Sequence, residues 1–288
     1  MITISNEQIS ATVNLHGAEI SSLKKRDTNT EYIWQADPSF WGRHSPILFP
    51  IVGRLKDDMY IHNGLTYRLF QHGFARDTAF KLVRQEGSCA CLSLKSNNQT
   101  LEVYPFKFEL LISYELKGNQ IGITFEVINQ DHQEMFFSIG AHPAFNCPLH
   151  QEEIRSDYTL LFPNPETAST QLLENGVRSG STIPVLHEQR ELIIADDLFE
   201  RDALIFDSLT SRMVTLKKED LNIVSVHFEG FPYLGIWSRD RDSPFICIEP
   251  WQGIADQISH NLQLSEKDGI IKLKAGEVFK CQYRIKLY

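Results

Sequence analysis

The sequence predicts an all-β protein built as a large antiparallel β-sandwich. Apolar residues alternate with polar or smaller ones in several segments, a period of two that is typical of strands with one buried face. Helical periodicity is nearly absent, and glycine, proline and asparagine separate the alternating segments. Because sandwich folds often reach this length undivided, we expect a single β-sandwich domain over residues 1–288.

The clearest expected element is a hairpin in the middle of the chain. Apolar residues alternate from Phe108 to Leu116, a turn follows at residues 117–120, and alternation resumes from Ile121 to Val127. A polar Gly-Asn turn between two alternating runs favours a β-hairpin. The same pattern, or a short apolar run, predicts further strands at residues 9–15, 203–206, 224–228, 244–248 and 279–287.

Few segments depart from the strand pattern. Residues 38–42 and 255–258 are the best helical candidates, and each is long enough for only one turn. Residues 147–190 contain four prolines and show the least regular pattern, which predicts long surface excursions. We find no linker, internal repeat or low-complexity tract.

Composition and charge disfavour several classes of partner. The net charge is −9 and no lysine or arginine cluster offers a surface for a phosphate backbone, so nucleic acid is not an expected partner. No apolar run approaches the roughly 20 residues of a membrane span, and the N-terminal residues do not resemble a signal peptide. We therefore expect a cytoplasmic protein, with its oligomeric state left open.

The five cysteines are odd in number and irregular in spacing, which favours reduced thiols over disulfides or a metal site. Phosphate-cradling glycine loops, a G-x-S-x-G elbow and an H-E-x-x-H pair are all missing from the sequence. These observations favour acid–base chemistry on a neutral substrate, and we expect neither a metal nor a cofactor.

Three segments carry residues suited to moving protons near neutral pH. Glu249 follows an apolar run and precedes Pro250, so partial burial would raise its pKa toward the range of a general base. The alternative, a surface glutamate at the end of an edge strand, stays open. Trp251 offers an aromatic face for the C–H face of a sugar. His142 and His72 both lie among small residues, although either one alone is more commonly structural than catalytic.

Two further polar residues adjoin apolar runs. Arg54 follows such a run and could offer its donors to a polyol, or could form a surface ion pair with Asp57 or Asp58. Asp202 precedes an apolar run and could accept hydrogen bonds from sugar hydroxyls, although a turn role is the more common one. The tryptophans other than Trp251 are expected in the core.

These residues resemble the motifs of the aldose 1-epimerase (galactose mutarotase) family, most nearly its LacX-like branch. Gly53-Arg54-Leu55 with Asn63-Gly64 and Tyr67, Gln71-His72-Gly73-Phe74-Ala75-Arg76, His142-Pro143-Ala144-Phe145-Asn146, and Glu249-Pro250-Trp251 occur in the family's order. Asp202 is similar to the family's sugar-binding aspartate, with Asp207 as a rival. The chain departs from mutarotases proper at Gly53, where they carry asparagine, and at Trp251, where they usually carry glutamine.

The resemblance implies a mutarotase-type sandwich with an open cleft that interconverts the anomers of a free hexose. It implies Glu249 as general base, His142 as general acid, His72 as a supporting donor, and Arg54 and Asp202 as sugar ligands. Because Phe74-Ala75-Arg76 is nearer the hexose-6-phosphate epimerase branch, Arg76 is a further candidate for substrate binding. A hexose-6-phosphate 1-epimerase and a non-catalytic carbohydrate-binding or regulatory protein are the alternatives.

Overall fold

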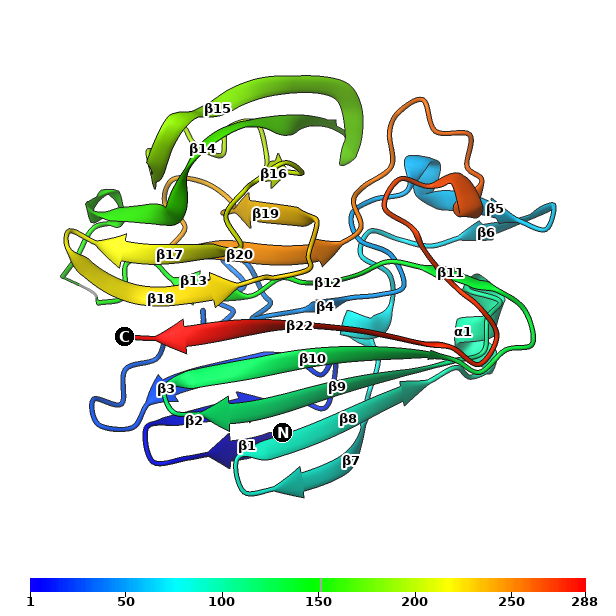
Figure 1. Ribbon diagram of the computed structural model, residues 1–288, viewed down its shortest axis with the longest axis horizontal. Helices are drawn as coiled ribbons and strands as arrows, with labels where there is room; N and C mark the ends of the chain where they lie inside the picture. Colours follow the sequence, from blue (N-terminus) through cyan, green and yellow to red (C-terminus); the bar gives the residue numbers. More distant parts are fainter. Residues whose placement is uncertain (151) are drawn as a thin grey trace.

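The computed structural model describes residues 1–150 and 152–288 and consists mainly of antiparallel strands (Figure 1). The largest sheet has nine strands. Its order is β15 (Val177–Ile193), β14 (Tyr158–Glu174), β17 (Met213–Lys218), β18 (Leu221–His227), β22 (Val278–Leu287), β10 (Gln120–Asn129), β9 (Phe108–Lys117), β8 (Cys89–Lys95) and β7 (Lys81–Glu86). The all-β prediction is confirmed.

A second sheet carries the residues of most interest. It consists of β16 (Leu204–Phe206), β19 (Tyr233–Trp237), β20 (Phe245–Gln252), β12 (Ile139–Ala141) and β4 (Ile47–Leu48), with β13 (Ala144–Asn146) also paired to β20. Three small sheets complete the described strands. They comprise β1 (Ile2–Ser5), β2 (Ile9–Val13) and β3 (Ile20–Lys25); β5 (Met59–His62) and β6 (Leu65–Arg68); and β11 (Met135–Phe137) with β21 (Ile271–Leu273).

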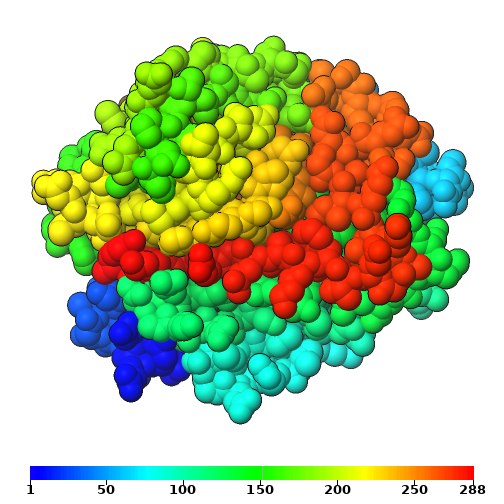
Figure 2. Space-filling model, in the orientation of Figure 1, coloured from blue at the N-terminus to red at the C-terminus, as the bar shows by residue number. Residues whose placement is uncertain are grey.

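The alternating stripes of the sequence form strands as expected. In β9 every second residue from Phe108 to Leu116 is buried, and β9 pairs with β10 across the predicted turn. The C-terminal strand β22 joins β18 to β10 within the large sheet. Figure 2 shows it as a continuous band on the surface between the segments of β17 and β18 and those of β9 and β10.

The prediction for residues 147–190 is wrong. Most of this segment forms β14 and β15, two 17-residue strands that pair with each other. The three prolines within these strands are accommodated because the pairing shifts register at several points, including between Leu161 and Glu166, and because β15 is an edge strand. Proline lowers the apparent regularity of a strand, but it does not prevent pairing at bulges and edges.

The segments expected to form single turns, residues 38–42 and 255–258, contain turns and no helix. The Trp41 N–H donates to the Asp37 carbonyl at 2.9 Å, and the second turn lies at residues 258–259. An unpredicted helix, α1, occupies Asn98–Val103. Asn97 caps it by accepting a hydrogen bond from the Thr100 N–H at 3.0 Å. Single 3-10 turns lie at η1 (Lys56–Asp58), η2 (Ala75–Asp77), η3 (Arg155–Asp157) and η4 (Leu264–Glu266). No helix in the described parts of the chain is long and apolar enough to cross a membrane.

Strand β20 separates the main core from a second apolar region. Its residues Ile246 and Ile248 belong to the largest buried cluster, which also includes side chains of the nine-stranded sheet. Cys247 and Trp251 belong to two smaller clusters on the opposite face. Because successive strand residues point to opposite faces, Glu249 points away from the main core, alongside Cys247 and Trp251.

Strand β20 is also longer than predicted and continues through Glu249 and Pro250 to Gln252. Its neighbour is interrupted at this level, because β12 ends at Ala141 and β13 begins at Ala144. Pro250 therefore lies beside a break in the strand pairing, where its missing backbone N–H costs no hydrogen bond between strands. The break consists of His142 and Pro143, so it brings His142 next to Glu249.

Candidate active site

Most of the predicted site residues surround one cavity. Its volume is about 260 Å³, and the aromatic, polar and small residues of several distant segments line it. The lining comprises Trp41, Gly53, Gln71, His72, Arg76, His142, Leu173, Gly176, Asp202, Ala203, Ile205, Trp237, Glu249, Trp251 and Ala255. Of the seven residues predicted for catalysis or binding, only Arg54 lies outside this lining.

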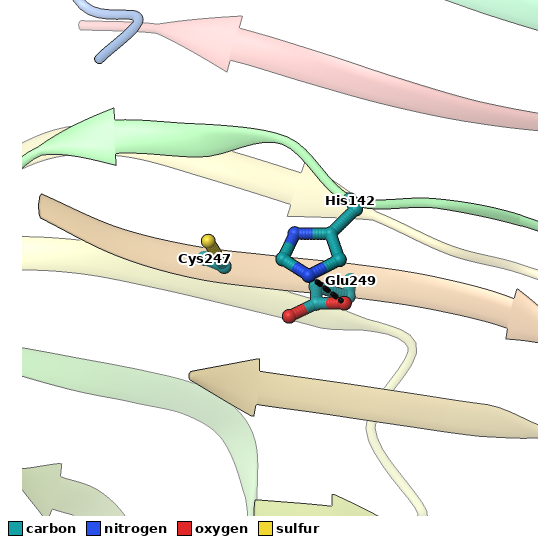
Figure 3. A group of neighbouring side chains, drawn as sticks. All are labelled: His142, Cys247 and Glu249. Atoms are coloured by element: carbon teal, nitrogen blue, oxygen red, sulfur yellow. Dashed lines mark ion pairs between the residues drawn. The ribbon is translucent and has the colours of Figure 1, made fainter. Parts of the chain in front are cut away.

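Glu249 and His142 form the closest polar contact in the cavity. The Oε2 atom of Glu249 lies 3.2 Å from Nε2 of His142, and it has no formed hydrogen bond among the described residues. Figure 3 shows the carboxyl group directly beside the imidazole edge. Glu249 is 1% exposed and His142 8% exposed, so water has little access to either group.

Burial shifts both groups toward their neutral forms. It raises the pKa of Glu249 well above its ordinary value, with the Trp251 side chain acting against this and Asp202 adding to it. Burial, together with the smaller effects of the nearby Arg76 and Arg43, lowers the pKa of His142 to about 3. Both shifts favour the neutral forms of the pair, with a proton on Glu249 rather than on His142.

Aromatic rings fix the orientation of the His142 imidazole. Trp41 stacks on it with ring centroids 4.8 Å apart and an angle of 26°, and Trp237 meets it edge-on at 5.8 Å. The expectation that these two tryptophans lie in the core is wrong, because both line the cavity. Their side chains come from a loop and from β19, and no local pattern indicates that they converge on one histidine.

His72 lies perpendicular to His142, with ring centroids 5.8 Å apart. Its Nδ1 accepts the Gly53 N–H at 3.1 Å, and its backbone N–H donates to the Gly53 carbonyl at 2.9 Å. Since Nδ1 is the acceptor, a neutral His72 carries its proton on Nε2 and is a donor there. Burial and the neighbouring His142 lower the pKa of His72 well below its ordinary value, which favours this neutral form.

The backbone at His72 is shaped by its neighbour Gly73. Both residues have φ of +68°. A Cβ atom on Gly73 would lie 2.3 Å from the Phe49 carbonyl oxygen, so only glycine fits this position. The glycine after the first histidine is therefore a steric requirement of the turn that presents His72.

The two predicted arginines have different positions. Arg76 lines the cavity and donates to the Gln71 carbonyl at 2.7 Å, while its buried Nε has no hydrogen-bond partner among the described residues. Burial lowers its pKa to about 10. Arg54 instead donates two hydrogen bonds to Asp58, at 2.8 and 2.7 Å, and a third to the Asn175 carbonyl at 2.9 Å. Its contact with a sugar stays a prediction.

The remaining predicted residues also differ in exposure. Asp202 is exposed, has a φ of +77° and lines the cavity, whereas Asp207 lies outside the lining and accepts a hydrogen bond from Gln171 at 2.8 Å. Trp251 is only 4% exposed. A Cβ atom on Gly235 would lie 2.5 Å from its ring, so the indole packs directly on the backbone of β19.

Cys247 lies near the acid–base pair, on the same face of β20 (Figure 3). One ligand atom from each of His142, Cys247 and Glu249 lies within 4.8 Å of the others. Ligands around zinc, each about 2.0–2.3 Å from the ion, are separated by roughly 4 Å or less, so this group would have to contract to hold one. Cys247 also packs among Trp34 and Phe245, and burial raises its pKa well above the ordinary value.

Comparison with known proteins supports the fold and shows the family. The family model described as aldose 1-epimerase matches residues 1–267. This chain belongs to the aldose 1-epimerase family. The chromosomal Protein LacX of Lactococcus lactis is 36% identical over 298 residues, which cover 99% of this chain and 98% of that protein. Membership places the chain among carbohydrate epimerases, a class of isomerases that act on sugars.

Solved structures of the aldose 1-epimerase family share the fold over the full length. A galactose mutarotase related enzyme from Lactobacillus acidophilus has a TM-score of 0.95 and 37% identity, and the match covers 100% of this chain and 97% of that one. A galactose mutarotase-like protein from Lactobacillus casei has a TM-score of 0.93 and 32% identity, with both chains covered completely. The mutarotase-type fold expected from the motifs is confirmed.

Proposed function

We propose that this protein interconverts the α and β anomers of a free hexose by general acid–base catalysis. The observation that carries the proposal is the buried contact between Glu249 and His142, 3.2 Å apart at the wall of a cavity of about 260 Å³. A carboxyl group and an imidazole at this distance can act on the two oxygens bound to one anomeric carbon. Family membership supports the same reaction class.

The reaction uses the ion-paired form of the two groups. The Glu249 carboxylate takes the proton of the C1 hydroxyl while the His142 imidazolium gives a proton to the ring oxygen, and the bond between C1 and the ring oxygen breaks. The C1–C2 bond of the open aldehyde rotates, and closure on the other face reverses both transfers. Ring opening therefore converts the ion pair into the neutral pair, the form that burial favours.

Other residues of the lining orient the sugar. The Nε2–H of His72, which lies 3.4 Å from the Gln71 side-chain amide nitrogen, is a donor to the ring oxygen once the sugar takes the place of that amide. Asp202 and Arg76 offer an acceptor and donors for hydroxyl groups. Trp41 and Trp237 supply apolar walls suited to the C–H faces of a sugar ring. Trp251 contributes an edge rather than an open stacking face, since it is almost fully buried.

The test is Glu249→Gln, which keeps the shape of the side chain and removes the base. We expect the catalysed rate of anomer exchange, followed by polarimetry and by exchange NMR over a panel of hexoses, to fall by about 10²–10⁴-fold. Glu126→Gln is the matched control, because Glu126 lies on β10 in the nine-stranded sheet and pairs with Lys280. A Glu249→Gln variant as fast as the wild type would refute the base assignment. If the wild type binds sugars but does not catalyse anomer exchange, the proposed enzymatic activity is refuted.

Arg76 gives one specific reason to consider a second candidate, a hexose-6-phosphate 1-epimerase. Its buried Nε has no hydrogen-bond partner among the described residues, and Arg43 lies close enough to lower its pKa. Asp77 pairs with Arg43 at 2.9 Å and lies 3.7 Å from Nε of Arg76, so an anion would compete with this carboxylate for both guanidinium groups. Competition between glucose and glucose 6-phosphate separates the two candidates, and Arg76→Met should weaken only the phosphorylated sugar if the second is correct.

A further inference from the structure

A buried ion pair lies behind the cavity wall without reaching the cavity. The Nζ atom of Lys267 lies 2.9 Å from Oδ1 of Asp256, and the two side chains are 0% and 1% exposed. Lys267 also donates to the Ile254 carbonyl. Taking two charges out of water is costly, so such a pair is retained only where it also satisfies further groups. Neither residue belongs to the cavity lining.

The second oxygen of Asp256 holds the chain segment that forms the facing wall. Oδ2 accepts the Lys56 N–H at 3.0 Å, and the Asp256 N–H donates to the Arg54 carbonyl at 2.9 Å. The two segments are in close contact, because a Cβ atom on Gly53 would lie 2.6 Å from the Ala255 Cα. Figure 1 shows the loop between β20 and β21 beside β5, and Ile61 of β5 bridges to Gln263 of that loop.

The segment held in this way carries the group that sets the proton position on His72. The Gly53 N–H donates to Nδ1 of His72 at 3.1 Å, and the Gly53 carbonyl accepts the His72 N–H at 2.9 Å. Asp256 therefore contacts the backbone on the C-terminal side of Gly53, and Ala255 packs against Gly53 itself. Every step from Lys267 to the imidazole is a direct contact between buried or half-buried groups.

We propose that Lys267 and Asp256 form a positioning pair that holds the Gly53 N–H against His72 and so keeps the His72 proton on Nε2. The pair touches no substrate and acts only through residues 53–56. This role rests on the proposed function, because the Nε2–H of His72 matters there as a donor to the sugar. The position of the ring proton can nevertheless be measured without any sugar.

Other charged groups surround the Lys267–Asp256 pair, and they determine which contacts Asp256 makes when Lys267 loses its charge. Nδ1 of His260 lies 3.3 Å from Oδ2 of Asp256, and Arg178 pairs with Asp268 while donating to the Ala255 carbonyl. If Lys267 loses its charge, Asp256 is left buried without its ammonium partner, and protonation or movement toward His260 relieves it. Either change weakens the acceptor that holds the Lys56 N–H.

The first experiment uses Lys267→Met, which keeps a long side chain and removes the charge. We expect the ring ¹⁵N shifts of His72, assigned by their loss in His72→Gln, to move from a single Nε2–H tautomer to an average of both. Because a misplacement of about 1 Å can cost about a hundredfold in rate, we expect kcat to fall by about 10- to 100-fold. KM should change much less. Lys280→Met, which breaks the exposed pair with Glu126, is the matched control and should change neither.

The double variant Asp256→Asn with Lys267→Met leaves no unpaired charge and can still accept the Lys56 N–H. Compared with Lys267→Met, the double variant should regain most of the Nε2–H tautomer population of His72 and most of the wild-type kcat. If Lys267→Met does not fold, the double variant takes its place in the test. If Lys267→Met folds and keeps the wild-type ring shifts of His72, the positioning role is overturned. If Lys267→Met does not fold, a folded double variant that has lost the Nε2–H tautomer overturns the positioning role. Wild-type protein that shows the Nε2–H tautomer but no anomer exchange would refute the proposed function alone.

Discussion

Glu249 is the residue for which the environment changes the chemistry most. An exposed glutamate would be a weak and fully ionised base at neutral pH, whereas burial raises the pKa of this one well above its ordinary value. His142, at 3.2 Å, is shifted the opposite way by the same cause. Both shifts favour the neutral form of the pair, which is the form that ring opening would produce in the proposed reaction.

The raised pKa of Glu249 predicts how stability depends on pH. Above about pH 4.5 the unfolded chain ionises this carboxyl while the folded protein keeps it protonated, so unfolding releases a proton and stability falls as pH rises. Glu249→Gln removes this dependence. We expect the variant to match the wild type near the ordinary pKa and to gain up to about 1.4 kcal/mol per pH unit above it, until the folded pKa is reached.

The measurement is urea unfolding of both proteins at several pH values between about 4 and 7. The titrations of groups that do not contact Glu249 cancel in the difference. The titration of His142, which contacts Glu249, cancels only while Glu249 is neutral. A difference in unfolding free energy that stays constant across this range would contradict a raised pKa at Glu249.

At the scale of elements, the site depends on where strands are interrupted. The neighbour of β20 breaks at His142 and Pro143, and β20 has Pro250 at the same level. The hairpin of β14 and β15 then covers the cavity with Leu173 and Gly176 near its tip. These two residues could not be predicted, because the sequence around them indicated an irregular excursion rather than a strand pair.

Arg54 anchors this hairpin tip through its hydrogen bond to the Asn175 carbonyl. We expect Arg54→Met to leave kcat nearly unchanged, to raise KM, and to speed amide hydrogen exchange in residues 173–178 by about tenfold, since one hydrogen bond contributes about 1 kcal/mol. Arg26→Met, on an exposed hydrogen bond to Asn6, is the control. Unchanged exchange together with lost sugar binding would instead support Arg54 as a direct sugar ligand.

At the scale of the whole molecule, the large buried cluster joins the two main sheets. It contains Ile285 and Ile123 from the nine-stranded sheet and Ile236 and Ile248 from the sheet that carries the site. The other face of that second sheet packs against Trp34 and Trp251, in the two smaller clusters beside the cavity. We propose that this continuity makes residues 1–288 one cooperative unit.

Ile285→Ala tests this proposal. Ile285 is fully buried on β22, so the substitution should cost about 2–5 kcal/mol through lost burial and a cavity. In a single cooperative unit, tryptophan fluorescence near the cavity and far-UV circular dichroism should shift to the same lower midpoint. A fluorescence midpoint that stays at its wild-type position would show that the sheets unfold independently.

The sequence by itself determined the strand-rich class, the main hairpin and the C-terminal strand, and it indicated the candidate acid–base residues. Period-two alternation and short motifs are local, so they can be read without knowing how the chain pairs. The tertiary structure alone decided that Glu249 lies within a strand and not at its end, and that Arg76 and Asp202 line the cavity while Arg54 does not. These facts depend on register between distant segments and on burial, which together set distances, pKa shifts and the proton on His72.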